Sequence, residues 1–150
     1  MKLILNSLFI VLFLGASCSE KPVHKQPLDA AYADSLNKVK KDYPFENWKK
    51  NQHAGLPQYT DANCNAARQI FDNLLAELAA LGKDASEADK IALFKAAIIR
   101  LNELNDGTAL IETGEAEQLV LLTNKIAIMA GIDPSKYGGG EGPASEWREW

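Results

Sequence analysis

The stretch that decides the fold is DANCNAARQIFDNLLAELAAL, which runs from Asp61 to Leu81. Its large apolar side chains recur every three or four residues, and this spacing places them on one face of a helix. Thr60 or Asp61 offers a side-chain cap at the start, and Gly82 is the residue type that commonly ends a helix. The expected apolar face consists of Ala67, Ile70, Phe71, Leu74, Leu75, Leu78 and Leu81.

Three more segments repeat this helical spacing. Residues 86–105 are joined to the first segment by about four residues, so these two helices should lie antiparallel. Residues 28–43 carry an apolar stripe that ends at Pro44, which cannot continue a helix. A fourth helix is expected between Thr113, as its cap, and Gly131.

The remaining segments lack a regular pattern. Residues 44–60 hold a glycine, two prolines and a polar run, which predict an irregular connector. Phe45 and Trp48 in this connector are too large to stay in water, so both should fold back onto the helices. The glycine-rich residues 138–143 are expected to form a flexible spacer. Because no strand pattern occurs, the fold class is all-α, a small bundle of about four amphipathic helices after a cleaved N-terminal signal helix.

The N-terminus resembles the signal of a bacterial lipoprotein. The apolar run 3–14 has the length of a signal-peptide core and is short for a spanning helix of about 20 residues. The sequence Leu14-Gly-Ala-Ser-Cys18 then resembles a lipobox, with Gly15 at a position where leucine is usual. This resemblance implies cleavage before Cys18 and lipid on its thiol. The alternatives are an ordinary secretory signal cleaved near Ala16 and an uncleaved anchor.

This interpretation divides the chain into three parts. Residues 1–17 are the signal peptide, residues 18–27 are a polar tether, and residues 28–150 are the helical domain. Lipid on Cys18 would anchor the domain to a membrane of the cell envelope, and the serine that follows favours the outer membrane over the inner one. Cys64 is the one other cysteine, so we expect no internal disulfide and a buried thiol.

The second half of the chain, about residues 60–150, resembles an uncharacterised family of small bacterial helical domains of unknown function. The resemblance rests on Leu101-Asn-Glu-Leu104, on Ile111-Glu-Thr113 and above all on the ending Glu146-Trp-Arg-Glu-Trp150. It implies a helical fold. It implies no activity, and no functional residue is transferred.

The sequence contains no recognisable catalytic or metal-binding motif. His24 and His53 are the histidines, and neither they nor the cysteines have the spacing of a metal site. Cys64 and His53 are the available nucleophile and base, but nothing in the sequence places them together. We therefore expect no metal and no cofactor. The net charge of −4 and the lack of a basic patch with interleaved aromatic residues argue against nucleic-acid binding.

Two features remain as candidate partner-binding sites. Glu112 and Glu115 belong to an acidic loop that either is simply solvated or presents a negative edge to a basic partner. Trp147, Arg148 and Trp150 are residue types enriched at interfaces, and one helical turn would place both tryptophans on one face. The same residues also suit a tail pinned to its own core. In that arrangement Arg148 should bridge to Glu112 or Glu115.

These observations lead to three hypotheses. The first is a non-enzymatic, membrane-anchored envelope lipoprotein that acts as a protein-binding module, in a special case an immunity-type protein that blocks a toxin. The second is an envelope hydrolase that uses the acidic residues around Glu112. The third is an accessory subunit of an outer-membrane complex. The sequence favours the first, because it offers a helical bundle without a catalytic set.

Overall fold

The computed structural model describes residues 29–150 of the protein, so the expected signal peptide, the tether with Cys18, and Leu28 lie outside the described residues. The described part is built of six α-helices and three 3-10 helices and has no strand, which confirms the all-α fold class. The elements are α1 (Ala30–Asn37), η1 (Lys38–Asp42), α2 (Phe45–His53), α3 (Asp61–Leu81), α4 (Glu87–Thr108), α5 (Thr113–Met129), η2 (Pro134–Lys136), η3 (Gly138–Gly140) and α6 (Pro143–Trp147).

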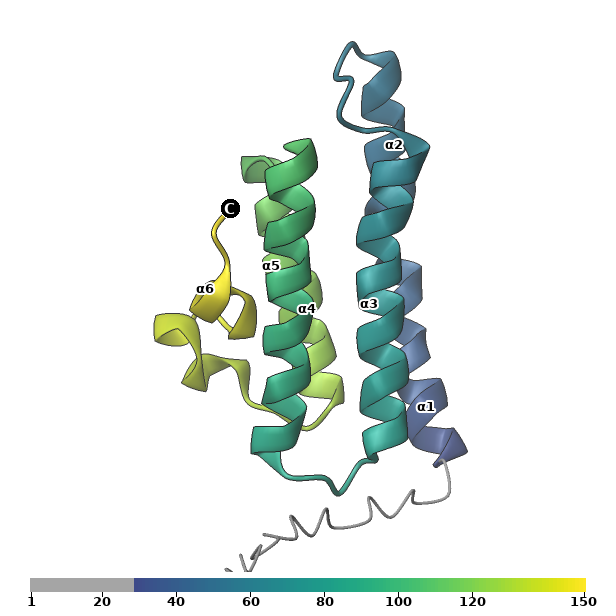
Figure 1. Ribbon diagram of the computed structural model, residues 1–150. Helices are drawn as coiled ribbons and strands as arrows, with labels where there is room; N and C mark the ends of the chain where they lie inside the picture. The colour runs from purple at the N-terminus through teal and green to yellow at the C-terminus, as the bar shows by residue number, and fades with distance from the viewer. Residues whose placement is uncertain (1–28) are drawn as a thin grey trace, which may run out of the picture.

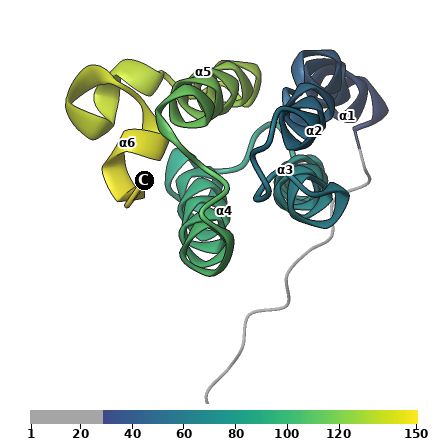
Figure 2. The same ribbon diagram turned by 90° about the horizontal axis from the view of Figure 1, so that it is seen from above.

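The helices are arranged as a bundle with an added C-terminal segment. The long helices α3 and α4 run antiparallel, as the short connection between them predicted (Figure 1). Seen from above, α1 and α5 form one side of the bundle and α3 and α4 the other, while α6 covers the outer edge of α4 and α5 (Figure 2). Over residues 29–150, no helix combines the length and the apolar character needed to cross a membrane.

The ends of α3 and α4 follow from their capping residues. The Thr60 hydroxyl accepts a hydrogen bond from the amide of Asn63 at 3.1 Å, and the Ser86 hydroxyl accepts one from the amide of Asp89 at 3.1 Å. The bounds expected for α3 are confirmed, whereas α4 continues three residues beyond the expected end at Asn105. It stops where Ala109 takes a left-handed conformation with a φ of 52°.

The expected first helix is divided in the structure. Its α-helical part ends at Asn37, and the chain tightens into the 3-10 helix η1 before an extended Tyr43. The residue before a proline is biased toward an extended backbone, which explains why the regular structure stops ahead of Pro44. The apolar stripe keeps its role despite the division, since its central residues Leu36 and Val39 are fully buried.

The prediction of an irregular connector over residues 44–60 is wrong for its first half, which is the helix α2. Pro44 starts this helix at its N-cap position instead of only ending the previous one. Phe45 and Trp48 lie one turn apart and are buried, as expected of them. Of the polar residues that argued against a helix, Lys50 and Gln52 are exposed, whereas Lys49 reaches α3 through Asp61 and Asn51 is half-buried.

An aromatic cluster joins α2 to the core. The ring centroids of Phe45 and Trp48 are 5.0 Å apart in an edge-to-face arrangement, and those of Phe45 and Phe71 are 5.8 Å apart. Tyr43 meets the edge of Phe45 at 5.1 Å. Such pairs favour defined ring orientations, so the cluster fixes α2 on α3.

The glycine-rich segment is folded, which corrects the expectation of a flexible spacer over residues 138–143. It forms η3 and then leads into α6, which lies against α4 and α5. Gly142 comes so close to α5 that a Cβ atom on it would lie 1.7 Å from Oδ1 of Asn124. The side-chain amide of Asn124 donates to the carbonyl of Glu141 at 2.8 Å and closes the segment onto α5.

Candidate functional site

An open groove with a volume of about 620 Å³ lies between η1 and α2 on one side and α5 on the other. Trp48 closes its floor and is 2 % exposed. The indole Nε1 of Trp48 donates to Oε1 of Gln118 at 2.7 Å, a bond between residues 70 positions apart. This bond joins α2 to α5 and sets the width of the groove.

Side-chain amides line both walls of this groove. Asn47 and Asn51 come from α2, and Gln118 faces them from α5. Asn47 uses its oxygen to accept from the ammonium of Lys50 at 2.9 Å. Because Trp48 and Lys50 can only donate here, each of these oxygens already accepts one hydrogen bond, and no hydrogen bond found among residues 29–150 uses the NH₂ groups of Gln118 and Asn47.

Of the two lysines that line the groove, one is held in an ion pair and the other is not. The ammonium of Lys125 lies 2.6 Å from a carboxylate oxygen of Asp42, so this pair spans the groove from α5 to η1. Lys41 also lines the groove and is exposed, and none of the ion pairs found among residues 29–150 involves it. Lys41 is therefore the cation that this groove can offer to a ligand.

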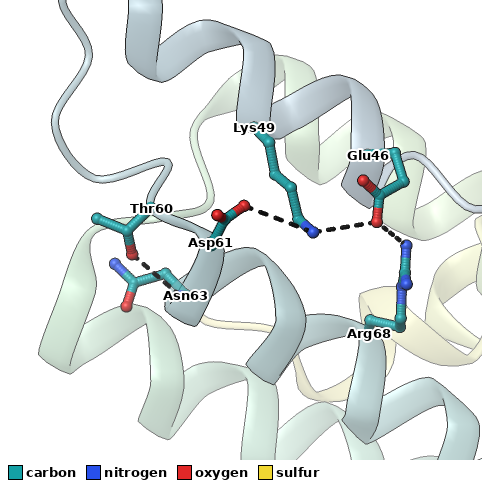
Figure 3. A network of polar contacts seen from close by, with 6 residues as sticks. All are labelled: Glu46, Lys49, Thr60, Asp61, Asn63 and Arg68. Atoms are coloured by element: carbon teal, nitrogen blue, oxygen red, sulfur yellow. Dashed lines mark hydrogen bonds and ion pairs between the residues drawn. The ribbon is translucent and has the colours of Figure 1, made fainter.

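A network of polar contacts holds the α2 wall of the groove on α3 (Figure 3). The ammonium of Lys49 lies 3.1 Å from Glu46 and 3.6 Å from Asp61, and Arg68 of α3 also binds Glu46. The hydrogen bond from Lys49 and the charge of Arg68 hold the pKa of the Glu46 carboxyl below its usual range. Exposed pairs of this kind contribute little to stability, so their main effect is to orient the helix.

Leu121 stands at the edge of the groove with 70 % of its surface exposed. On its other side lies a second, shallower hollow of about 480 Å³ that Leu121 lines together with Val120 and Arg148. The exposed leucine thus lies between two hollows, one lined by α2 and α5 and the other by α5 and the residues Glu141 and Arg148 on either side of α6. Leu121 and its half-buried neighbour Val120 form a small apolar patch with charged residues around it, and apolar surface with a polar rim is one mark of an interaction site.

Of the two acidic candidates, Glu115 lies at the groove and Glu112 does not. Glu115 lines the groove and is 8 % exposed. It also faces Tyr59, and burial together with this carboxylate raises the pKa of the tyrosine. Glu112 is exposed at the start of α5, where it accepts from the amide of Gln58 at 3.1 Å.

The structure does not bring the C-terminal candidates to these acids. Arg148 lies 3.3 Å from Glu141, so the expected bridge from Arg148 to Glu112 or Glu115 is wrong. The reason is local, because the turn before α6 returns Glu141 to the neighbourhood of Arg148. Arg148 also lies 5.8 Å from the ring centroid of Trp150, a distance at which a cation attracts an aromatic face.

The terminal tryptophans pack on the molecule itself. Trp147 and Trp150 are half-buried against the core. Buried Asn102 of α4 donates to the carbonyl of Trp147 at 2.9 Å and accepts from the amide of Glu149 at 3.2 Å. These contacts support the pinned arrangement of the tail and leave less of both rings available to a partner.

The described residues do not form a metal site or an evident nucleophilic centre. No group of three or more His, Cys, Asp or Glu side chains within residues 29–150 is placed to hold a metal ion. Cys64 is fully buried, as expected, and burial raises the pKa of its thiol, which disfavours the reactive thiolate.

The groove itself could not be found from the sequence, because one of its walls is the unexpected helix α2. A signal for this helix was nevertheless present. Phe45 and Trp48 have a helical spacing, and Glu46 and Lys49 can pair within one turn. The facing wall requires the long-range contact from Trp48 to Gln118, which no local pattern contains.

A scan against protein-family models, a search of curated proteins and a search of solved structures each found no match. The resemblances stated from the sequence therefore stay predictions.

Proposed function

We propose that the protein is a non-enzymatic, membrane-anchored lipoprotein of the cell envelope that binds a protein partner through the face around Leu121. The observation that carries this proposal is the position of Leu121, which is 70 % exposed between two hollows. The free energy of burying one leucine side chain is about 1.5–3 kcal/mol, so a partner that covers it gains substantially. The charged residues around it form the polar rim that such interfaces have.

The anchor in this proposal is lipid on Cys18, which precedes the described residues. One acyl chain alone binds a membrane only marginally, and the several chains of a lipoprotein would hold the domain firmly. The outer membrane is the expected location. In the narrower, immunity-type form of the proposal, the partner is a toxin that reaches the envelope.

Photo-crosslinking in the bacterium that produces the protein tests the binding face. A crosslinking residue in place of Glu117, an exposed residue that lines the hollow beside Leu121, should give one adduct of defined mass. Adding Leu121→Glu should abolish this adduct. The matched control is Ile99→Glu, which places the same charge at an exposed apolar position of α4. Equal adducts from both variants, or none with the native leucine, would contradict the proposal.

Fatty-acid labelling tests the anchor. The native chain should incorporate labelled fatty acid and sediment with the outer membrane. Cys18→Ala should lose the label, while Cys64→Ala should keep it. Label that persists in Cys18→Ala would exclude this anchor.

The mass of the photo-crosslinked adduct also separates two forms of the proposal. If the crosslinked partner is an integral outer-membrane protein, the accessory-subunit hypothesis is favoured over the immunity-type one.

A further inference from the structure

We infer that the groove between α2 and α5 binds an extended peptide segment, whose main-chain carbonyls accept hydrogen bonds from Asn47, Asn51 and Gln118. This inference rests on the proposed protein-binding function and specifies the form of the partner. In the same inference, Lys41 forms an ion pair with an acidic side chain of the peptide segment.

The first argument is the kind of hydrogen-bonding group that the groove presents. Trp48 and Lys50 each donate to an amide oxygen, of Gln118 and of Asn47, and this orients the two side chains so that their N–H groups, which have no partner within residues 29–150, are available in the groove. Asn51 has no side-chain hydrogen bond among those found in residues 29–150, and so retains both of its groups. Since the carboxylate of Asp42 is paired with Lys125 and Glu115 is buried, the unpartnered N–H groups suit a ligand that supplies hydrogen-bond acceptors.

The second argument is spacing. Asn47 and Asn51 are four residues apart on α2, which corresponds to about 6 Å along a helix axis. Carbonyls on the same side of an extended chain repeat every two residues, or about 6.6 Å. Two carbonyls that lie two residues apart on one edge of the peptide can therefore accept hydrogen bonds from Asn47 and Asn51, one from each.

The third argument excludes other ligand shapes. A helical partner satisfies its own backbone groups, so it would leave the amides of the groove without main-chain acceptors. A sugar ring would need an exposed aromatic face, but Trp48 is 2 % exposed and Tyr43 is half-buried. An extended peptide offers free carbonyls and, in addition, an apolar side chain that can pack on Leu121.

The fourth argument is charge. Lys125 is engaged by Asp42 across the groove, whereas Lys41 is exposed without an ion pair in the described part of the chain. An acidic side chain near the η1 end of the segment would pair with Lys41. The expected recognition pattern is therefore an extended segment that combines an acidic residue with a leucine-like residue.

The test selects heptapeptides from a random phage-displayed library on the full-length lipidated protein in detergent. The selected peptide is then synthesised in two forms, one with its native backbone and one in which a single amide is replaced by an ester, a weaker acceptor. Affinities of both forms are measured for the native protein and for Asn47→Ala/Asn51→Ala. The matched control is Asn65→Ala/Asn73→Ala, which removes exposed amides of α3.

Each lost amide contact should weaken binding about two- to tenfold, and the control should bind like the native protein. At one position of the peptide, the ester should weaken binding to the native protein and have no further effect on Asn47→Ala/Asn51→Ala. Lys41→Glu should weaken binding of an acidic peptide. Helical selected peptides, equal affinity for the asparagine variant, or binding of soluble glycan strands in place of peptide would overturn the inference.

The two proposals fail in different ways. If the crosslinker at position 117 captures a partner in a Leu121-dependent manner but no extended peptide is bound, the proposed function stands and the peptide inference is wrong. If the crosslink is also absent, both are wrong.

Discussion

The ammonium of Lys90 donates to the carbonyl oxygen of Ala130 at 2.9 Å and to that of Lys83 at 2.6 Å. Ala130 is the C-cap of α5, and Lys83 follows Gly82, the C-cap of α3. Helix C-terminal ends carry unpaired carbonyls and partial negative charge. A lysine that is 6 % exposed is therefore stabilised without a carboxylate partner, and it joins three helices at one end of the bundle.

The first prediction concerns this contact. Lys90→Met keeps most of the side-chain volume but leaves two carbonyls without their donor. The free energy of unfolding should fall by about 1–3 kcal/mol, because buried unpaired polar groups cost that much. Urea denaturation measures the change. Lys83→Met removes an exposed ammonium and keeps the Lys83 carbonyl, so it should have little effect. Equal stability of the two variants would show that the Lys90 contacts are unimportant.

The second prediction concerns the terminal tryptophans. Asn102→Ala removes the donor to the carbonyl of Trp147 and the acceptor for the amide of Glu149. The C-terminal tail should then detach, and the tryptophan fluorescence emission should shift to longer wavelength. The free energy of unfolding should fall by about 1–3 kcal/mol. Asn73→Ala, at an exposed position of α3, is the control. An unchanged emission spectrum would mean that packing of the rings alone holds the tail.

Local patterns in the sequence were sufficient for α3 but not for the groove. The Thr60 cap, the apolar face and Gly82 all lie within or beside α3, so its bounds could be predicted. The Trp48–Gln118 bond depends on how two helices far apart in the sequence pack together. The pairing of Arg148 with Glu141 depends on the path of the turn between them. Local periodicity carries no information about such contacts, and this is why the groove and the partner of Arg148 were missed.

The third prediction concerns Gly142, which has a φ of 113° and lies against Asn124. Gly142→Ala should destabilise the protein by about 1–3 kcal/mol, because this backbone region is almost restricted to glycine. The added Cβ would also displace Asn124 from its bond to Glu141. Gly114→Ala in α5 meets nothing within 4 Å, so it should leave stability equal or slightly higher. Thermal denaturation of both variants tests this prediction. Similar melting temperatures for Gly142→Ala and Gly114→Ala would contradict it.

The fourth prediction concerns alkaline pH. The hydroxyl of Tyr137 donates to Glu87 at 2.7 Å, and this bond, with some burial, raises the pKa of Tyr137 to about 12. The folded state thus holds a proton that the unfolded chain loses near pH 10. The stability gained from this bond is complete below about pH 10 and is lost as the pH rises toward 12.

Ultraviolet absorbance of tyrosinate checks this shift, with Tyr137→Phe used to identify the contribution of Tyr137. Glu87→Gln removes the charged acceptor, so the pKa of Tyr137 should return toward its ordinary value near 10. Glu117→Gln changes an exposed carboxylate of α5 and should leave the titration of Tyr137 unaltered. If Tyr137 titrates near pH 10 in the native protein, its hydroxyl does not bind Glu87 in solution, and η2 and η3 are then attached to α4 by other contacts.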